Sequence, residues 1–223
     1  MRAPRSLVFA LFPLLASCQV FKPQSESATS IPIRLQGELT VSGGKLVLRP
    51  CNEKRQLLIS NDGSTSLARD AAELLADGPG PLFADVRGRP AASQPSEGDG
   101  QLSLTQVYRL QREGHGCADP DFKRLTLHAN GHEPDWSINV SAKGLLLQRP
   151  GQESLALPYV EEQLPEGRFN LTSEANGQRL ELWVAPQRCV DTMSGAVQHL
   201  AAELRLNGKV QRGCAYYGGL RSE

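Results

Sequence analysis

IRLQGELTVSGGKLVLRP, residues 33–50, alternates apolar and polar side chains on both sides of a short turn at Ser42, Gly43 and Gly44. Alternation of this kind is typical of strands buried on one face, because successive side chains of a strand point to opposite faces. Glycine accepts the positive φ values that tight turns require. The stretch therefore predicts an antiparallel β-hairpin near the start of the folded chain.

The residues that follow extend this hairpin into a small barrel. RQLLI (55–59) predicts a third strand, and the spacing of leucines and alanines in LARDAAELLAD (67–77) predicts an amphipathic helix. PLFADVRGR (81–89) and QLSLTQVYRL (101–110) predict two more strands. Three strands, one helix and two strands is the order of an OB-fold barrel. We therefore expect residues 31–123 to form an OB-like β-barrel domain.

The second half of the chain, residues 124–223, alternates almost throughout. Asn176–Gly177 and Asn207–Gly208 are dipeptides favoured in two-residue hairpin turns. We expect a domain built as a small antiparallel β-barrel or meander, in which only residues 194–201 could be helical. The predicted fold class is all-β, mainly antiparallel, with one short helix.

The N-terminus has the features of an export signal. Arg2 and Arg5 precede the apolar run LVFALFPLLA (7–16), which is too short to span a bilayer as a helix. LASC (15–18) resembles the bacterial lipobox, which implies that residues 1–17 are a lipoprotein signal peptide and that Cys18 becomes acylated. A plain signal peptide with an incidental cysteine is the alternative.

Acylation at Cys18 would decide where the protein works. Each buried methylene contributes about 0.8 kcal/mol, so two or three acyl chains anchor a protein in a lipid bilayer. Gln19 in place of aspartate implies, by resemblance to lipoprotein sorting, the bacterial outer membrane, with the protein facing the periplasm. Residues 18–30 are polar and serine-rich, which predicts a flexible tether.

The charge balance excludes one class of partner. Removal of residues 1–17 takes away Arg2 and Arg5, which leaves 22 of the 24 basic residues against 24 acidic ones. Nucleic-acid binding requires a basic surface that neutralises phosphates, and the sequence has no run of lysine or arginine. We therefore expect no nucleic-acid partner.

Four further cysteines remain if Cys18 carries lipid: Cys51, Cys117, Cys189 and Cys214. An even set in an oxidising compartment predicts disulfides, and three pairings are possible. Sequential pairing, Cys51 with Cys117 and Cys189 with Cys214, is the choice that gives each half of the chain one disulfide. A metal site is the alternative, but no pair has CxxC spacing.

The first half resembles a known lipoprotein domain. GELT (37–40), PCNEKRQLLI (50–59), PLFADVRGR (81–89) and a cysteine after the fifth strand are similar to the C-terminal OB domain of the NlpE family. These are copper-homeostasis and adhesion-sensing lipoproteins of the Cpx envelope-stress pathway. The CxxC motif of that family's N-terminal domain is missing, so copper handling and redox sensing are not implied.

The second half resembles a family of uncharacterised periplasmic β domains. Its motifs stand here as GHEPDW (131–136), CVDTMS (189–194) and RGCA (212–215). The resemblance implies a fold and a disulfide but no activity, and His132 and Asp135 replace the usual Asn and Phe. The residues that match the family motifs are Glu133, Pro134, Trp136, Asp191, Met193 and Ser194.

The segment HANGHEPDW (128–136) holds the densest polar cluster, and its residue types suit a divalent metal. The weak candidate ligands are His128, His132, Glu133, Asp135 and Asp191. The alternative, which we favour, is a surface loop without metal. There Glu133 accepts backbone hydrogen bonds, Pro134 stiffens the turn and Trp136 begins a core strand.

No catalytic residues are predicted. Ser137 and Ser194 are the only serines in a suggestive context, and neither lies in a GxSxG turn between a strand and a helix. His115, His128, His132 and His199 could act as bases only through proximity that the sequence does not reveal. We expect Asp191 and Thr192 to end a strand, with Met193 in the core beside Trp183.

The aromatic residues give a weak indication of partners. Phe83 and Tyr108 are expected in the core, whereas Tyr216 and Tyr217 must point to opposite faces of a strand, which would expose one of them. The sequence thus predicts a non-enzymatic lipoprotein, without cofactor, in a binding or envelope-stress role. Its partners would be the bilayer and an unknown envelope protein or small ligand. Inhibition of a lysozyme-type hydrolase and metal binding at the HEPDW loop are alternatives.

Overall fold

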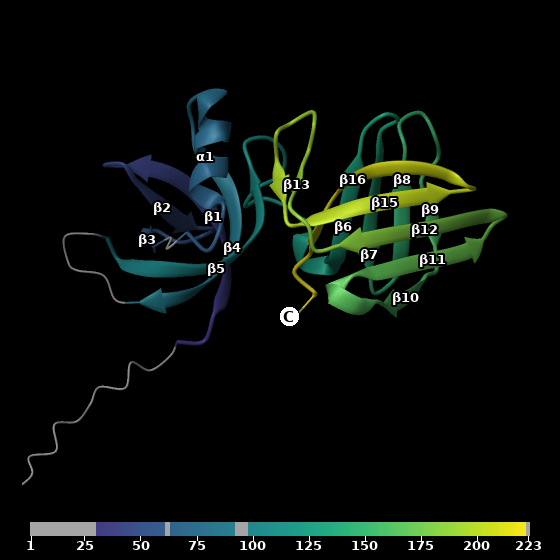
Figure 1. Ribbon diagram of the computed structural model, residues 1–223, viewed down its shortest axis with the longest axis horizontal. Coiled ribbons are helices and arrows are strands. Elements are labelled where there is room, and N and C mark those ends of the chain that lie inside the picture. The colour runs from purple at the N-terminus through teal and green to yellow at the C-terminus, as the bar shows by residue number, and fades with distance from the viewer. Residues whose placement is uncertain (1–29, 61–62, 92–97, 222–223) are drawn as a thin grey trace, which may run out of the picture.

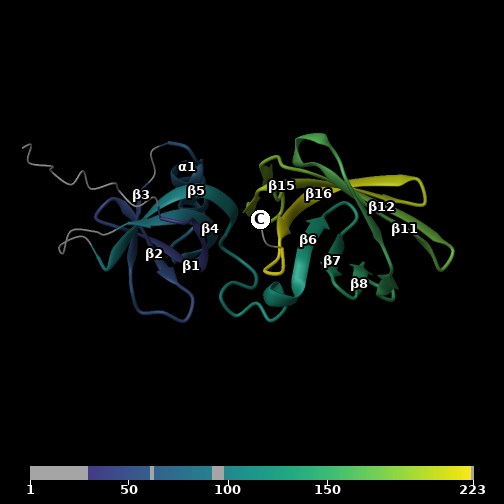
Figure 2. The same ribbon diagram turned by 90° about the horizontal axis from the view of Figure 1, so that it is seen from below.

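The computed structural model describes residues 30–60, 63–91 and 98–221. The expected signal peptide, Cys18 and the expected tether up to residue 29 lie outside the described residues. Two β bodies lie side by side along the long axis of the molecule (Figure 1), and the view from below shows the same arrangement (Figure 2). Among the described residues, no helix has the length and apolar character needed to cross a membrane.

The first body is a closed barrel of mixed strand direction. Its strands follow the order β1-β2-β3-β5-β4, and β4 pairs back with β1. All pairs are antiparallel except β3 with β5. The OB-like barrel predicted from the sequence is confirmed. The strands are β1 (Ile33–Ser42), β2 (Lys45–Pro50), β3 (Leu57–Ser60), β4 (Leu82–Ala91) and β5 (Gly100–Gln111).

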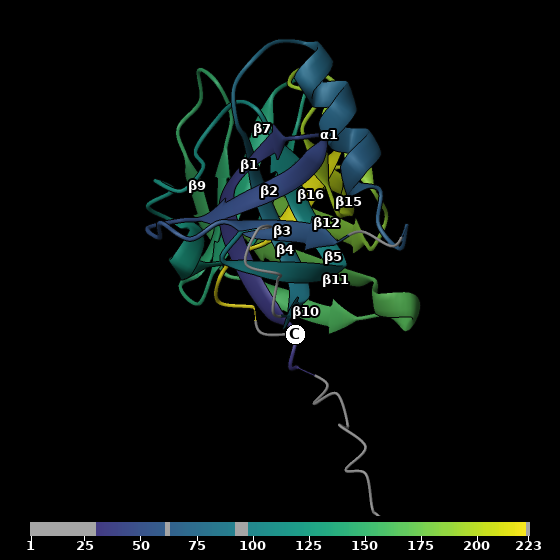
Figure 3. The same ribbon diagram turned by 90° about the vertical axis from the view of Figure 1, so that its left-hand side faces the viewer.

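The predicted helix is α1 (Leu67–Ala76), between β3 and β4. Leu67, Ala71 and Leu74 recur at helical spacing and are buried in the barrel core, which explains why this amphipathic segment packs against the barrel (Figure 3). Asp70 is buried on the same side of the helix and has partners outside it.

The second body is a nine-stranded antiparallel sheet in the order β10-β11-β12-β15-β16-β6-β7-β8-β9. Its edge strands β9 and β10 are separated in the chain only by Pro158 and Tyr159, so the sheet must curl until its edges lie close together. The result is a half-barrel, whose strands are β6 (Leu125–Gly131), β7 (Trp136–Ser141), β8 (Gly144–Gln148), β9 (Leu155–Leu157), β10 (Val160–Gln163), β11 (Phe169–Ala175), β12 (Gln178–Ala185), β15 (Leu200–Leu206) and β16 (Lys209–Tyr217). Two 3₁₀ turns, η1 (Phe122–Arg124) and η2 (Pro165–Gly167), precede β6 and β11.

The predicted glycine and asparagine turns are present. Gly43 and Gly44 have φ values of 57° and 76° between β1 and β2. Asn176 and Asn207 have φ values of 54° and 50° in the hairpins β11–β12 and β15–β16. These local signals fix the hairpins because few other residues tolerate positive φ.

One short hairpin crosses from the second half of the chain to the first sheet. β13 (Cys189–Val190) pairs with β14 (Val197–Gln198), and β14 pairs with β5, where Val197 lies opposite Leu110. The helix considered for residues 194–201 is wrong, because β14 and the start of β15 occupy that segment. The first sheet therefore contains residues from both halves of the chain.

The structure holds the disulfides Cys51–Cys117 and Cys189–Cys214, the sequential pairing expected from the order of the cysteines. Each half of the chain holds one disulfide, as expected, but the two bonds differ in what they join. Cys51–Cys117 lies within the first body, but Cys189 is on β13 of the first sheet and Cys214 is on β16 of the second. The second disulfide therefore joins the two sheets.

Candidate functional site

The two bodies meet along a contact that we call the seam, where β1 and β5 of the barrel face β6, β16 and the end of the shared hairpin. Aromatic and arginine side chains dominate it. The seam residues are Arg34, Tyr108, Arg109, His199, Tyr216 and Tyr217.

Arg34 ties the barrel to the end of β16. Its Nε and Nη2 donate to the two carboxylate oxygens of Asp85, each at 2.8 Å, and Asp85 is fully buried. The same guanidinium donates to the backbone oxygens of Tyr217 at 2.7 Å and Gly218 at 3.1 Å. Its centre lies 3.9 Å from the centroid of the Tyr108 ring. Arg34 is thus bonded on its edges and stacked on one face.

His199 lies beside Arg34 in the seam. Its backbone N–H and its ring Nδ1 both lie 3.0 Å from the carbonyl oxygen of Tyr108, so Nδ1 carries the proton and donates it. The ring makes edge contacts with Tyr108 and Tyr217. Burial lowers the pKa of His199 to about 4, so the imidazole is neutral at pH 7.

Arg109 is a buried cation with incomplete hydrogen bonding. Its side chain is 4% exposed, and its guanidinium lies between the rings of Phe83, at 4.7 Å, and Tyr216, at 4.1 Å. Nε and Nη2 have no hydrogen-bond partner in the described part of the chain. The nearest carboxylate oxygen is Oδ2 of Asp119, 3.8 Å from Nη2, which is too long for a hydrogen bond.

A polar cavity of about 340 Å³ opens next to Arg109 between the two bodies. Burial lowers the pKa of His128 and raises the pKa of Tyr216 to about 12, so both side chains are uncharged at pH 7. The cavity also holds the guanidinium of Arg109 and four carboxylates, those of Glu113, Asp119, Asp121 and Asp191. Its wall includes Asp119, His128, Asn130, Asp191, Gln198 and Tyr216.

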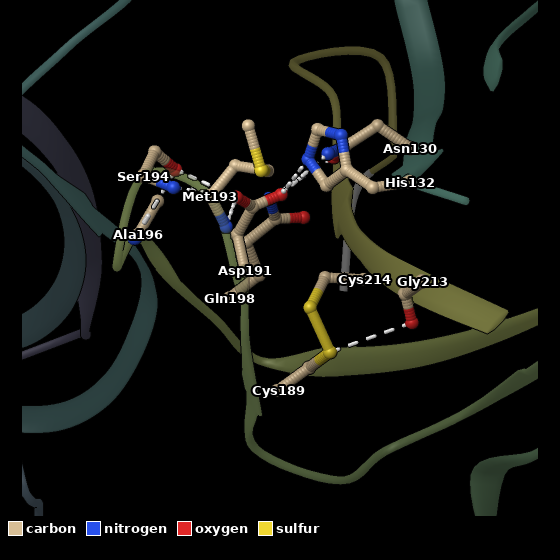
Figure 4. The surroundings of a disulfide bond; sticks show 10 residues. All are labelled: Asn130, His132, Cys189, Asp191, Met193, Ser194, Ala196, Gln198, Gly213 and Cys214. Carbon is tan, nitrogen blue, oxygen red and sulfur yellow. Dashed lines mark hydrogen bonds and ion pairs between the residues drawn. A yellow bond between two sulfur atoms is a disulfide. The ribbon is translucent and has the colours of Figure 1, made fainter. Parts of the chain in front are cut away.

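Asp191 organises one side of this cavity (Figure 4). Its Oδ1 accepts hydrogen bonds from the backbone N–H groups of Met193 and Ser194 and from the Ser194 hydroxyl, at 2.9–3.0 Å. Its Oδ2 accepts from Asn130 Nδ2 at 2.9 Å and from His132 Nε2 at 3.0 Å. Burial raises the pKa of Asp191, but the hydrogen bonds from Ser194 and His132 outweigh it and hold the pKa below its usual value.

His132 lies between two carboxylates. Its Nδ1 is 2.7 Å from Oδ1 of Asp135, and its Nε2 bonds to Asp191. The hydrogen bond with Asp135 raises the pKa of His132 despite partial desolvation, and Asp191 acts in the same direction. The HEPDW loop is thereby fastened to the turn that closes the shared hairpin.

The candidate metal ligands do not form a metal site. Both ring nitrogens of His132 are bonded to carboxylates, and Nδ1 of His128 bonds to Asn139 at 2.6 Å. Among the described residues, no group of three or more His, Cys, Asp and Glu side chains is placed to hold a metal ion. The sequence cluster therefore brings together His132, Asp135 and Asp191 but not Glu133 or His128.

The loop itself differs in detail from the surface loop that we expected. Glu133 is exposed, has a positive φ of 65° and, within the described chain, accepts no backbone hydrogen bond. Pro134 follows it through a cis peptide bond. Trp136 begins β7 and is buried in the second core, as predicted.

The serines have no base beside them. The Ser194 hydroxyl donates to Asp191, not to a histidine. Ser137 lies on β7 opposite Asn130. In the described part of the chain, neither serine hydroxyl is hydrogen-bonded to a histidine, which is the geometry that nucleophilic activation requires. Asp191 instead ends β13 through its turn, as expected.

Several aromatic and apolar predictions can be checked directly. Phe83 and Tyr108 are buried, as predicted. Tyr216 and Tyr217 point to opposite faces, but Tyr216 is buried in the seam and Tyr217 packs against Phe169, so neither ring is freely exposed. Met193 is 77% exposed, so its predicted place in the core is wrong.

A larger cavity of about 830 Å³ lies over the outer face of β12, β15 and β16. Its arginines already have carboxylate partners. Arg188 pairs with Asp70 at 2.8 Å, and Arg205 pairs with Glu203 at 2.8 Å. Arg168 and Arg212 pair at 3.3 and 3.5 Å with Glu166 and Glu203. Of these two cavities, the smaller one has a deeply buried arginine whose donors lack partners among the described residues, so we take it as the candidate site.

The sequence did not single out Arg109 or Asp119. One signal was available: Tyr108, Arg109, Leu110 and Gln111 end β5 as a run in which strict alternation of apolar and polar residues is lost. All four prove buried, which is what a strand covered on both faces produces.

Comparisons with protein-family models, with curated proteins and with solved structures find no match for this chain.

Proposed function

We propose that this protein is a lipid-anchored lipoprotein of the bacterial envelope that binds a ligand or partner at the seam and has no catalytic role. The observation that carries the proposal is the polar cavity that opens between two β bodies that share a hairpin and a disulfide. Ligand sites form preferentially between domains, where two surfaces can supply polar groups from different elements.

The location follows from the cysteines. Two disulfides indicate a protein that works outside the cytoplasm, because thiols are kept reduced inside it. The lipobox resemblance of LASC (15–18) supports an anchor at Cys18, and Gln19 supports the outer membrane and its periplasmic face. The OB-like barrel is compatible with the resemblance to NlpE-type lipoproteins, which supports a role in envelope integrity or stress sensing.

Binding is favoured over catalysis by how the polar groups are used. Asp191, His132 and Ser194 bond to one another and to the backbone, so their hydrogen-bonding capacity maintains the loop. Nucleophilic catalysis needs a nucleophile and a base within hydrogen-bond reach of each other. Three of the buried atoms that lack a partner among the described residues, Arg109 Nε and Nη2 and Gln198 Oε1, belong to residues that line the cavity, which suits recognition.

The anchor is tested by expressing the full chain in a diderm bacterium with a labelled fatty acid. The wild type should incorporate the label, lose residues 1–17 and sediment with the outer membrane, whereas Cys18→Ser should do none of these. Ser17→Ala is the matched control, since it changes the neighbouring small residue but keeps the cysteine and both disulfides. An unlabelled, unprocessed wild type with free thiols would contradict the proposal.

The cellular role is tested separately with a deletion strain. Loss of the gene should change an envelope-stress reporter or the permeability of the outer membrane, and the wild-type chain should restore both. The absence of any phenotype and of any captured partner would argue against a binding role. Stoichiometric inhibition of lysozyme by the purified protein would favour the inhibitor alternative instead.

A further inference from the structure

We propose that Arg109 binds the carboxylate of a small molecule in the seam cavity, of the amino-acid or hydroxy-acid class. This inference rests on the proposed binding function and names its ligand chemistry. It begins with the pair of donors, Nε–H and Nη2–H, that form one edge of the guanidinium and that have no partner among the described residues.

Arg34 shows how the same pair of donors is satisfied elsewhere in this protein. In Arg34 the same two nitrogens donate to both oxygens of Asp85, each at 2.8 Å, in the bidentate geometry that guanidinium and carboxylate groups favour. Both guanidinium groups also stack on aromatic rings in the seam. Arg109 therefore has the surroundings of Arg34 without the carboxylate.

The missing partner matters because Arg109 is buried. A charged group taken out of water is strongly destabilising unless it is paired and its hydrogen bonds are made. The rings of Phe83 and Tyr216 lie against the guanidinium, but neither makes a hydrogen bond to its Nε or Nη2. The edge requires acceptors, and the adjoining cavity is the place from which they can come.

Asp119 is close enough to offset the charge of Arg109 but makes no hydrogen bond to its Nε or Nη2. Its Oδ1 is held by the backbone N–H groups of Asp121 at 3.0 Å and Phe122 at 3.1 Å. This leaves Oδ2 at 3.8 Å from Nη2. Asp119 thus lowers the electrostatic penalty of the buried cation and leaves both edge donors buried without a hydrogen-bond acceptor among the described residues.

A second unsatisfied group defines the rest of the ligand. Gln198 on β14 is 5% exposed, and its Nε2 donates to Asn130 at 3.1 Å. Its Oε1 is buried without a hydrogen bond inside the described chain, and Gln198 lines the same cavity. A buried acceptor requires a donor, which an ammonium or hydroxyl group beside the carboxylate would supply.

The size and charge of the cavity restrict the ligand further. A volume of about 340 Å³ lies at the lower end for ligand pockets, so the ligand is small. The carboxylates of Glu113, Asp119, Asp121 and Asp191 line the cavity against the single arginine, which disfavours a dianion such as phosphate. Among monocarboxylates an α-amino acid fits best, because its ammonium group offsets its own negative charge, and an α-hydroxy acid offers the same carboxylate with a neutral donor.

The experiment is an NMR titration of the full-length protein, with the arginine Nε–H signals observed and the Arg109 signal assigned by its loss in Arg109→Lys. The probes are L-alanine, lactate, acetate and inorganic phosphate. L-Alanine and lactate should shift the Arg109 signal saturably, acetate should do so more weakly, and phosphate should have no effect.

Variants assign the two contacts. Arg109→Lys keeps the charge but loses the bidentate edge, and its affinity for L-alanine should fall by about tenfold or more. Gln198→Ala should lower the affinity for L-alanine and lactate by about threefold to tenfold and leave the affinity for acetate unchanged. Arg212→Lys is the matched control on the surface, and it should change no affinity by more than about twofold.

Three outcomes would overturn the inference. An Arg109 signal that no carboxylate moves, but that Asp119→Asn moves, would show an internal pair only. Saturation by phosphate and not by acetate would contradict the carboxylate class. Equal binding by wild type and Arg109→Lys would place the ligand elsewhere. None of these depends on acylation, so failure here differs from failure of the anchor at Cys18.

Discussion

The two β bodies close in opposite ways. The barrel brings five strands round until β4 pairs with β1, whereas the larger sheet leaves β9 and β10 unpaired with each other. Yet the closed barrel is the body that receives a strand from the other half of the chain, because β14 pairs with the part of β5 that extends beyond β3. Closure of a sheet and independence of a body are therefore separate properties in this protein.

The seam sharpens this contrast, because it concentrates buried charge. Asp85 and Arg109 of the barrel are almost fully buried against the second body. The second sheet keeps its arginine–glutamate pairs on an outer face, where Arg205 and Glu203 are 45% and 26% exposed. Buried pairs depend on the docking of the bodies, whereas surface pairs do not. The following experiments separate the contribution of the buried contacts at the seam to stability from that of the exposed ion pairs.

Removal of each disulfide should give the largest effects. By loop-closure entropy, loss of Cys51–Cys117, with a separation of 66 residues, lowers the free energy of unfolding by about 4 kcal/mol. Loss of Cys189–Cys214, with a separation of 25, lowers it by about 3.5 kcal/mol. For each disulfide, a variant with both cysteines replaced by alanine is compared with the wild type by denaturant unfolding, which measures the two losses of free energy.

The two disulfide variants should differ in where they loosen the molecule. Hydrogen exchange should become faster in β14 when Cys189–Cys214 is absent, since that bond holds the shared hairpin to β16. The Cys51–Cys117 variant should leave β14 protected. Equal exchange in both variants would contradict the division of roles between one bond within a body and one bond between bodies.

The buried pair at the seam comes next. Asp85→Asn removes the charge partner of Arg34, and breaking a buried pair of this kind is expected to cost about 3 kcal/mol. Glu203→Gln breaks exposed pairs on the second sheet and should cost less than about 1 kcal/mol. Denaturant unfolding checks both, and equal losses would remove the distinction between seam and surface.

The pH dependence of stability should have opposite signs at two histidines. The pKa of His199 is lowered to about 4, so the unfolded chain binds more protons and stability falls as the pH drops from about 6.5 towards 4. The raised pKa of His132 adds stability below pH 6.5, which is lost as the pH rises through its folded-state pKa.

Unfolding of His199→Gln and His132→Gln between pH 4 and 8 tests this. His199→Gln should flatten the acid side of the profile by the uptake of about one proton, although His128, whose pKa burial also lowers, still contributes there. His132→Gln should leave the acid-side fall caused by His199 in place and remove stability below pH 6.5. Identical profiles for both variants would show that neither histidine titrates as its surroundings imply.

The smallest effect is expected at Met193. Its side chain is 77% exposed in the turn of the shared hairpin, so Met193→Ala should change the free energy of unfolding by less than about 0.5 kcal/mol. Leu182→Ala, in the second core, is the control and should cost about 2–5 kcal/mol. A loss of several kcal/mol at Met193 would mean that it is buried in solution.

The sequence was most informative where structure is local. The Ser42–Gly44 turn, the Asn-Gly hairpins and the leucine spacing of α1 were all predicted, because each depends on residues a few positions apart. The sequential disulfide pairing, chosen from three possible ones because it gives each half of the chain one bond, was also correct. The barrel came from the order of elements, since few topologies connect three strands, a helix and two strands compactly.

The site was harder to predict because it depends on distant residues. β13 and β14 are two residues long, which is too short for any periodic pattern. Arg109 and its neighbour Gln198, for example, are more than 80 positions apart in the chain. The cluster HANGHEPDW, read as a surface loop or a metal site, contributes His128 and Asn130 to the cavity lining, but its partners on the barrel were invisible in the sequence.

The β5–β14 pairing has a consequence for the order in which the protein folds. The barrel precedes, in the chain, the residues that cover it: residues 197 and 198, which pair with Leu110 and Arg109 on β5, follow about 90 positions later. Until they arrive, a folding barrel presents unpaired backbone groups along this edge of β5, which can pair with other chains. This edge is therefore the part of the barrel that needs protection until the C-terminal third of the chain has joined it.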